Sequence, residues 1–276
     1  MKISNKVKIM RKLVLLCLLS WPLIPLAVEQ ELLFGVYTSD KPSDMVHKFR
    51  PLLNDLQQRL SARLEKTIVI HLRVLSSYEK GIQALVTGKI DFARFGPASY
   101  ILSQQLNPDI SLLAMESKNG KKTFNGIIAV QKESPYQQLS DLKGVRFAFG
   151  DKNSTIGRYL AQSELLKAGI KASDLASFSY LGRHDKVGEV INIGQYTAGS
   201  LKESSFKKLL DKGADLRKLH EFTNVTKPWL ARSGLDDNLL IALRQILLDM
   251  SGFLPAEEQD YLIIKQSIDE NAGFFQ

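Results

Sequence analysis

Ser154 and Thr155 stand where the sequence changes from one pattern to another. An apolar run at 145–150 is followed by a polar turn with Gly150 and Asn153, and then by apolar residues at helical spacing. This order predicts a strand, a turn and a helix that begins near Ser154. The first turn of a helix leaves backbone N–H groups unpaired, and the helix dipole adds partial positive charge there. The junction therefore has the chemistry of an oxyanion site, with two hydroxyl donors beside it.

The same residues have a simpler explanation, because Asn and Ser commonly cap helix starts. Asn153 or Ser154 would then satisfy one backbone N–H and bind no ligand. The two roles are compatible, since Asn153 can cap the helix while Ser154 and Thr155 bind an anion. Residues 95–99 and 182–184 have the same pattern of a strand passing into a helix start, which favours a binding role.

Catalytic and metal chemistry find little support in the sequence. Ser154, His184 and Asp185 offer the side chains of a hydrolytic triad. However, the chain has no G-x-S-x-G motif, and the Asp adjoins the His in sequence, which makes the usual geometry awkward. The four His residues lack metal-ligand spacing, and there is no Walker-type loop. We therefore expect no enzyme activity, no metal and no cofactor.

The elements that would position the Ser-Thr junction alternate between strand and helix. Strand patterns occur at 32–37, 67–75 and 89–95, and helical patterns occur at 45–64 and 78–87. Such alternation predicts an α/β fold with parallel βαβ units, in which ligands bind beyond the carboxyl ends of the strands. Pro51 lies inside the first helical pattern and either kinks that helix or begins a second one.

The first residues have the pattern of a secretory leader. Five basic residues precede an uncharged run at 13–27, which two prolines interrupt. This run is short for a membrane-spanning helix and matches a signal peptide at 1–27 that is removed on export. The single cysteine, Cys17, lies within the leader without the small residues of a lipoprotein signal, so we expect neither a lipid anchor nor disulfides.

Removing this leader also changes the charge of the chain. The whole chain has 37 basic and 29 acidic residues, and the leader holds five of the former and none of the latter, which leaves 32 − 29 = +3. No stripe of basic residues interleaved with aromatics is present. We therefore expect no nucleic-acid partner.

Six short motifs in a fixed order give the sequence a family resemblance. They are S-Y-E at 77–79, D-F-A-R-F-G-P-A-S-Y at 91–100, L-K-G at 142–144, N-S-T at 153–155, G-R-H-D at 182–185 and P-W-L-A-R at 228–232. Together they resemble the phosphate-, phosphite- and phosphonate-binding periplasmic proteins of ABC importers. The resemblance implies an exported, periplasmic solute-binding protein, monomeric, that captures a small oxyanion and delivers it to a membrane permease.

The resemblance also implies a type 2 periplasmic-binding fold. Each of two lobes would hold a mostly parallel sheet flanked by helices, and the ligand would bind in the cleft between the lobes. We expect the two crossover segments near residues 125–131 and 220–227. Lobe one then comprises residues 28–125 and 223–276, and lobe two comprises residues 126–222.

Six residues are implied as ligand-binding by their positions in these motifs. Tyr37, at the end of the first predicted strand, is a seventh candidate, with cleft lining and core or rim packing both left open. Ser154 and Thr155 would donate hydroxyl and backbone N–H groups, and His184 a ring N–H. The remaining candidates belong to lobe one. Tyr78 would donate its phenol, and Ser99 lies at the helix start beside it. Phe95 would form an apolar wall, and Tyr37, if it contributes, would line the cleft.

Several positions depart from the family pattern. Ile156, Arg158 and Thr197 differ from the residues common there, so these positions, with Phe95, are where the ligand preference would change. Binding an aminoalkylphosphonate requires carboxylates, and the matching positions here are Ser204 and Lys227. An amino-bearing ligand is therefore disfavoured. The sequence leaves open whether the cleft serves an importer or a membrane sensor.

Overall fold

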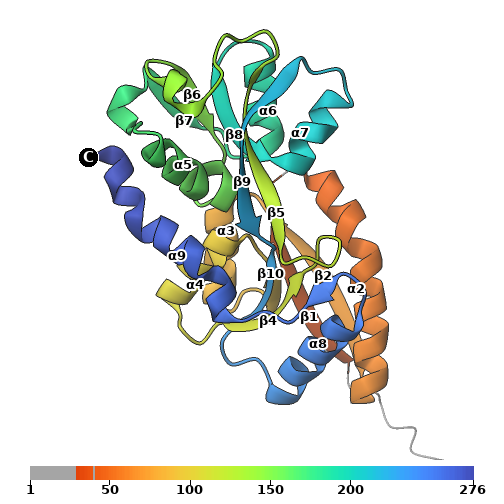
Figure 1. The fold of residues 1–276 in the computed structure, drawn as a ribbon. Helices are drawn as coiled ribbons and strands as arrows, with labels where there is room; N and C mark the ends of the chain where they lie inside the picture. Colours follow the sequence, from red (N-terminus) through yellow and green to blue (C-terminus); the bar gives the residue numbers. More distant parts are fainter. Residues whose placement is uncertain (1–28, 40) are drawn as a thin grey trace, which may run out of the picture.

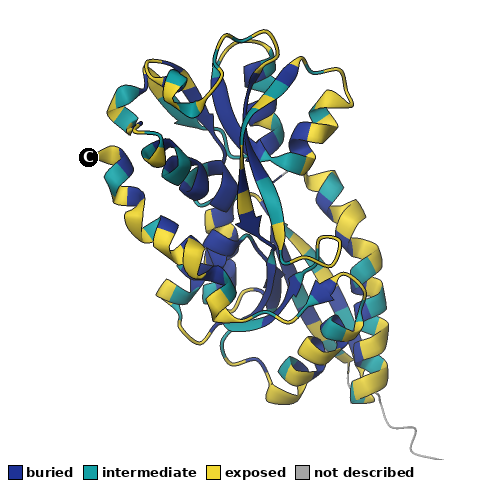
Figure 2. Ribbon diagram, viewed as in Figure 1, coloured by how far each residue is buried: buried dark blue, intermediate teal, exposed yellow. Residues whose placement is uncertain are grey.

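The computed structural model describes residues 29–39 and 41–276, so the leader predicted at 1–27 lies outside the described residues. The chain forms two lobes, each built on its own sheet with helices against it (Figure 1). The strands of both sheets are largely buried, and the outer faces of the helices are exposed (Figure 2). The predicted two-lobed α/β fold is confirmed.

The first sheet combines parallel and antiparallel pairs. Its strand order is β11 (Phe253–Leu254), β4 (Ser111–Glu116), β10 (Pro228–Ala231), β3 (Phe92–Arg94), β1 (Glu29–Tyr37) and β2 (Thr67–Leu75). β1 is parallel to β2 and β3, as the βαβ pattern predicts, whereas β10 and β11 are antiparallel to their neighbours. The helices of this lobe are α2 (Pro42–Leu64), α3 (Tyr78–Val86), α4 (Pro97–Leu106) and α8 (Asp237–Asp249).

The second sheet is also mixed. Its order is β7 (Ser177–Tyr180), β6 (Arg146–Phe149), β8 (Ala198–Lys202), β5 (Thr123–Gln131) and β9 (Leu216–Val225). β6 is parallel to β7 and β8, but β5 is antiparallel to β8 and β9. The flanking elements are the helices α5 (Ala161–Lys167), α6 (His184–Asn192) and α7 (Glu203–Leu210), with the short turns η1 (Leu139–Leu142), η2 (Thr155–Leu160) and η3 (Ala172–Asp174). The sheets are therefore mixed rather than mostly parallel.

The chain passes between the sheets at residues 117–122 and at Thr226 and Lys227. The segments in which we expected the crossovers, 125–131 and 220–227, lie mainly within β5 and β9. These two strands pair from Thr123↔Val225 to Gln131↔Leu216. The connections are thus short, and the two long strands belong to the second sheet along their whole length.

Aromatic residues fill the core of the first lobe. Trp229 is fully buried and stacks on Phe34 with ring centroids 4.7 Å apart, while Phe253 meets it edge-on at 5.2 Å. Helix α2 covers this face of the sheet and is continuous, so Pro51 neither ends it nor begins a second helix. The charged outer face of α2 faces away from this core, as the spacing of its apolar residues predicts.

The C-terminal segment connects the two lobes. It contains η4 (Glu258–Tyr261), α9 (Leu262–Asp269) and η5 (Glu270–Phe275); α9 contacts α4 in the first lobe, and η5 packs against α5 in the second. Asn271 donates a hydrogen bond to Gln162 Oε1 at 2.6 Å and accepts one from Arg158 at 2.7 Å. The last residues therefore pack on lobe two, although we expected them in lobe one.

We predict that Phe274→Ala destabilises the protein by about 3 to 5 kcal/mol, the usual cost of removing a buried Phe. Phe274 is fully buried and meets the Phe149 ring edge-on at 5.8 Å. Urea unfolding measures the free energy, and Phe275→Ala is the matched control, because 48% of Phe275 is exposed. Equal losses for the two variants would contradict the role given to Phe274.

Candidate functional site

Three helix starts face a small cavity between the lobes. They are the start of α4 at Gly96 and Pro97, the start of η2 at Ser154 and Thr155, and the start of α6 at His184. The cavity, which we call the anion pocket, has a volume of about 20 Å³, room for about one water molecule. Three elements predicted to be strand-to-helix turns thus present their backbone N–H groups to one place.

Ser154 is the cap of the second of these starts. Its Oγ accepts a hydrogen bond from Gly157 N–H at 3.0 Å, so Ser154 rather than Asn153 caps the helical turn. The turn is tight because Gly150 N donates to Gly157 O at 2.8 Å. A Cβ added to Gly157 would lie 2.8 Å from Gly150 Cα, so this position requires glycine. Since the cap uses only the oxygen of Ser154, its O–H group can still donate to a ligand.

The two lobes meet through direct hydrogen bonds at the anion pocket. Ala98 N in α4 donates to Thr155 Oγ1 at 2.9 Å, and His184 N in α6 donates to Ser39 O at 3.3 Å. Ala98 and Ser39 belong to the first lobe, whereas Thr155 and His184 belong to the second. The structure therefore has the lobes closed on each other, with helix-start N–H groups paired across the cleft.

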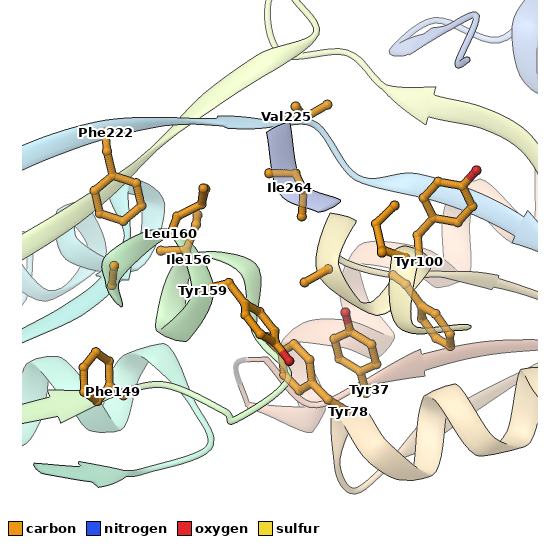
Figure 3. Close-up of a cluster of buried hydrophobic side chains, with 14 of the residues drawn as sticks. Tyr37, Tyr78, Tyr100, Phe149, Ile156, Tyr159, Leu160, Phe222, Val225 and Ile264 are labelled. Atoms are coloured by element: carbon orange, nitrogen blue, oxygen red, sulfur yellow. The ribbon is translucent and has the colours of Figure 1, made fainter. Parts of the chain in front are cut away.

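Tyr37 organises the wall of the first lobe. Its phenol accepts a hydrogen bond from Gly96 N and shares another with Ser99 Oγ at 3.0 Å. Burial raises the pKa of Tyr37 to about 12, so the phenol keeps its proton at neutral pH. Its ring stacks on Tyr78, with centroids 3.8 Å apart, and on Phe95 at 5.0 Å. Tyr159 belongs to the same buried cluster and reaches it from the second lobe (Figure 3).

The structure brings five of the seven predicted site residues together around the anion pocket. These are Tyr37, Tyr78, Ser154, Thr155 and His184. Phe95 and Ser99 lie behind Tyr37, where one stacks on its ring and the other bonds its phenol. Both are fully buried and support the pocket wall.

Two of the unusual positions noted in the sequence have different places in the structure. Ile156 lines the anion pocket and gives it an apolar wall. Arg158 is not among the residues that line the pocket. It donates to Lys152 O at 2.7 Å and to Asn271 Oδ1, and so connects η2 to the C-terminal segment.

Besides the helix start at Gly96 and Pro97 and the side chain of Ile156, four further residues that were not predicted as ligand-binding line the pocket. They are Phe124 on β5, Lys202 at the end of β8, Asn224 on β9 and Lys227 in the second connection between the lobes. Asn224 is buried, and within the described residues its Oδ1 has no hydrogen-bond partner. The pattern of Asn224 is that of an ordinary strand residue, and only the pairing of β5 with β9 brings it to the cleft.

Asp185, the acid of the triad considered in the sequence, forms an ion pair with Arg183. The Nη2–Oδ2 distance is 2.9 Å. Across residues 29–39 and 41–276 no three potential ligands gather to hold a metal ion. Among the helices in that same part of the chain, none combines the length and apolarity needed to cross a membrane.

Comparison with known proteins identifies the family. A family model described as the periplasmic substrate-binding protein of phosphonate ABC transporters matches residues 34–267. A probable phosphite-binding ABC transporter protein of Prochlorococcus marinus is 25% identical over 209 residues, which cover 66% of this chain and 67% of the relative. A phosphate-import protein of Mycolicibacterium smegmatis is 24% identical over 186 residues, covering 63% of this chain but only 56% of that protein.

A solved structure agrees with the sequence comparison. The structure of a Prochlorococcus marinus protein in complex with methylphosphonate superposes with a TM-score of 0.74 and covers 87% of this chain and 97% of that one. At 20% identity this likeness shows a shared fold. Because the family model spans most of the chain, the protein belongs to the family of periplasmic substrate-binding proteins of phosphonate ABC transporters.

Proposed function

We propose that the protein captures a small phosphorus oxyanion in the anion pocket and delivers it to an ABC importer. The observation that carries this proposal is the meeting of three helix starts, from both lobes, at one cavity. Their N–H groups and dipoles favour an anion without a paired cation. Ser154, Thr155, Tyr78 and His184 are the ligand-binding side chains, and Tyr37 holds the wall against which the ligand lies.

The energy available to such a site fits its purpose. Four charge-assisted hydrogen bonds contribute about 6 to 12 kcal/mol in total, before the cost of ordering the ligand and the lobes. Micromolar binding requires about 8 kcal/mol. The closed pocket of about 20 Å³ is too small for a phosphonate group, so the lobes must open to admit it. The ligand then takes over the hydrogen bond that Ala98 N makes to Thr155 Oγ1.

The proposed cellular setting follows from the family. An exported binding protein requires a leader, and residues 1–27 have that pattern. The named relatives are transport proteins, which supports delivery to a permease over the sensing alternative. The pairing of Asp185 with Arg183 supports binding without catalysis.

Calorimetric titration with phosphate, phosphite, methylphosphonate and sulfate tests the proposal. We expect at least one of the phosphorus anions to bind and Ser154→Ala combined with Thr155→Ala to abolish that binding. The free energy of unfolding should fall by only about 1 to 2 kcal/mol, the scale of a lost cap. Ser173→Ala with Ser177→Ala is the control, because both residues are exposed on the second lobe. Binding of none of the four anions would refute the proposal.

Tyr78→Phe isolates the contribution of one hydroxyl. The variant keeps the ring that stacks on Tyr37 but cannot donate to the ligand. We expect affinity to fall 10- to 100-fold, because hydrogen bonds to charged groups contribute about 1.5 to 3 kcal/mol. The melting temperature without ligand is measured alongside, so that a loss of folding is not mistaken for a loss of binding.

Tyr100→Phe makes the same chemical change at a control position. Tyr100 lies on α4 and packs edge-on against Tyr261, with centroids 5.0 Å apart, outside the anion pocket. Its variant should bind as the unmodified protein does. If Tyr78→Phe also binds with full affinity, the phenol is not a ligand-binding group.

A further inference from the structure

A second, larger cavity adjoins the anion pocket. It has a volume of about 180 Å³, and we call it the basic pocket. Phe124, Lys202 and Lys227 line both cavities, so these residues form the boundary between them. A molecule with its head in the anion pocket would therefore extend past these side chains into the basic pocket.

Positive charge dominates the walls of the basic pocket. Five cationic side chains line it, from both lobes and from the connections between them: Lys48, Arg94, Lys118, Lys202 and Lys227. Two carboxylates are present, and both are already engaged. Glu116 accepts two hydrogen bonds from Arg94, at 2.9 and 2.7 Å, and lies 3.4 Å from Lys48 Nζ. Glu203 pairs with Lys207 on α7, with a Nζ–Oε1 distance of 2.5 Å.

Lys227 is the basic-pocket cation whose positive charge is least compensated by nearby negative groups. The residue is half-buried, and among the described residues its ammonium group makes no hydrogen bond or ion pair. Its recorded contact is with the face of the Phe124 ring, 5.8 Å from Nζ to the centroid. Burial, followed by the nearby Arg94 and Lys202, lowers the pKa of Lys227 well below its usual value, although Glu116 acts in the opposite direction.

Lys48 shows the same crowding of positive charge. The neighbouring Arg94, together with burial, lowers the pKa of Lys48 to about 8 even though Glu116 lies beside it. The guanidinium of Arg94 and the ammonium of Lys48 also depress the pKa of Glu116, outweighing the effect of its burial. One carboxylate thus serves two cations, and no negative charge remains for Lys227.

Thr226 adds a neutral donor to the same wall. It precedes Lys227 in the connection between the lobes and lines the basic pocket. Only 3% of Thr226 is exposed, and its Oγ1 has no hydrogen-bond partner among the described residues. A buried hydroxyl without a partner is costly, and a ligand oxygen in this cavity would remove that cost.

We propose that the ligand carries a second anionic group, a carboxylate or another phosphorus oxyanion, which binds in the basic pocket while the first oxyanion occupies the anion pocket. Lys227 and Thr226 contact the second group, with Arg94, Lys48 and Lys202 around them. This inference rests on the proposed function and names its substrate class: a phosphonate with a short anionic tail. The ligand supplies the negative charge that the pocket lacks.

Three phosphonates of matched length test the tail by calorimetric titration at constant ionic strength. 3-Phosphonopropionate has an anionic tail, propylphosphonate a neutral one and 2-aminoethylphosphonate a cationic one. We expect 3-phosphonopropionate to bind at least tenfold more tightly than propylphosphonate, because a partly desolvated charge pair is stronger than an exposed one. 2-Aminoethylphosphonate should bind most weakly.

The Lys227→Met variant distinguishes recognition of the ligand's tail from recognition of its head group. Because Lys227 lines both cavities, the quantity to compare is the ratio of the two affinities within each protein. In the variant, the preference for 3-phosphonopropionate over propylphosphonate should fall to within about threefold. The variant should also melt a few degrees higher without ligand, because a poorly compensated charge has been removed from the cavity. Lys132→Met is the matched control, since Lys132 is exposed and follows the opposite end of β5 from Phe124. Lys48→Met is a second variant at an exposed position and should weaken the preference as well.

The outcomes distinguish this inference from the proposed function. Equal affinity for propylphosphonate and 3-phosphonopropionate would overturn the inference that the ligand has an anionic tail. The proposed capture of an oxyanion would be unaffected. If Lys227→Met binds none of the three phosphonates and its melting temperature does not rise, Lys227 has a general structural role. That result would also overturn the inference. If no phosphonate binds the unmodified protein, both proposals fail.

Discussion

The structure depends on backbone N–H groups that helices leave unpaired at their starts. A soluble protein must satisfy such groups wherever it buries them. At the start of α4, Tyr37 accepts from Gly96 N, and Thr155, from the other lobe, accepts from Ala98 N. One of the donors that favour an anion, Ala98 N, therefore holds the lobes together in its absence. Ligand binding exchanges an acceptor provided by the protein for one provided by the ligand, which couples capture to the relative position of the lobes.

Much of this arrangement could be predicted from the sequence, because its signals are local. The strand, turn and helix around Ser154 follow from apolar runs separated by polar residues, and the helix start at His184 lies where its motif indicates. The sequence left Asn153 and Ser154 as alternative caps, since Asn and Ser have similar preferences for this position, and the structure selects Ser154. Local patterns also could not distinguish residues in the pocket from those behind it. Phe95 and Ser99 support Tyr37 only because the ring of Tyr37 lies between them and the cavity.

The remaining features required contacts between residues far apart in the chain. β5 and β9 were mistaken in part for crossovers, because their apolar patterns do not reveal that they pair with each other along their length. The C-terminal segment was assigned to the first lobe, yet Phe274 packs on Phe149 of the second. Arg158 was suspected of changing the ligand, but its partner is Asn271, more than a hundred residues away. Asn224 gave no signal at all, since a polar residue in a strand is usually exposed.

In the proposed function, the two cavities recognise negative charge in different ways, and this difference gives them separate roles. Although Lys202 and Lys227 also line the anion pocket, its helix-start dipoles and hydroxyls suit any small oxyanion of fitting shape. The basic pocket uses point charges, which discriminate strongly by the sign of the tail. Arg94 is fixed by its two hydrogen bonds to Glu116, whereas Lys227 has no such partner within the part of the chain that the structure describes. A lysine that is costly to protonate alone gains most from a ligand that brings the missing charge. In this proposal the anion pocket thus selects the chemical class of the ligand, and Lys227 selects the member of that class.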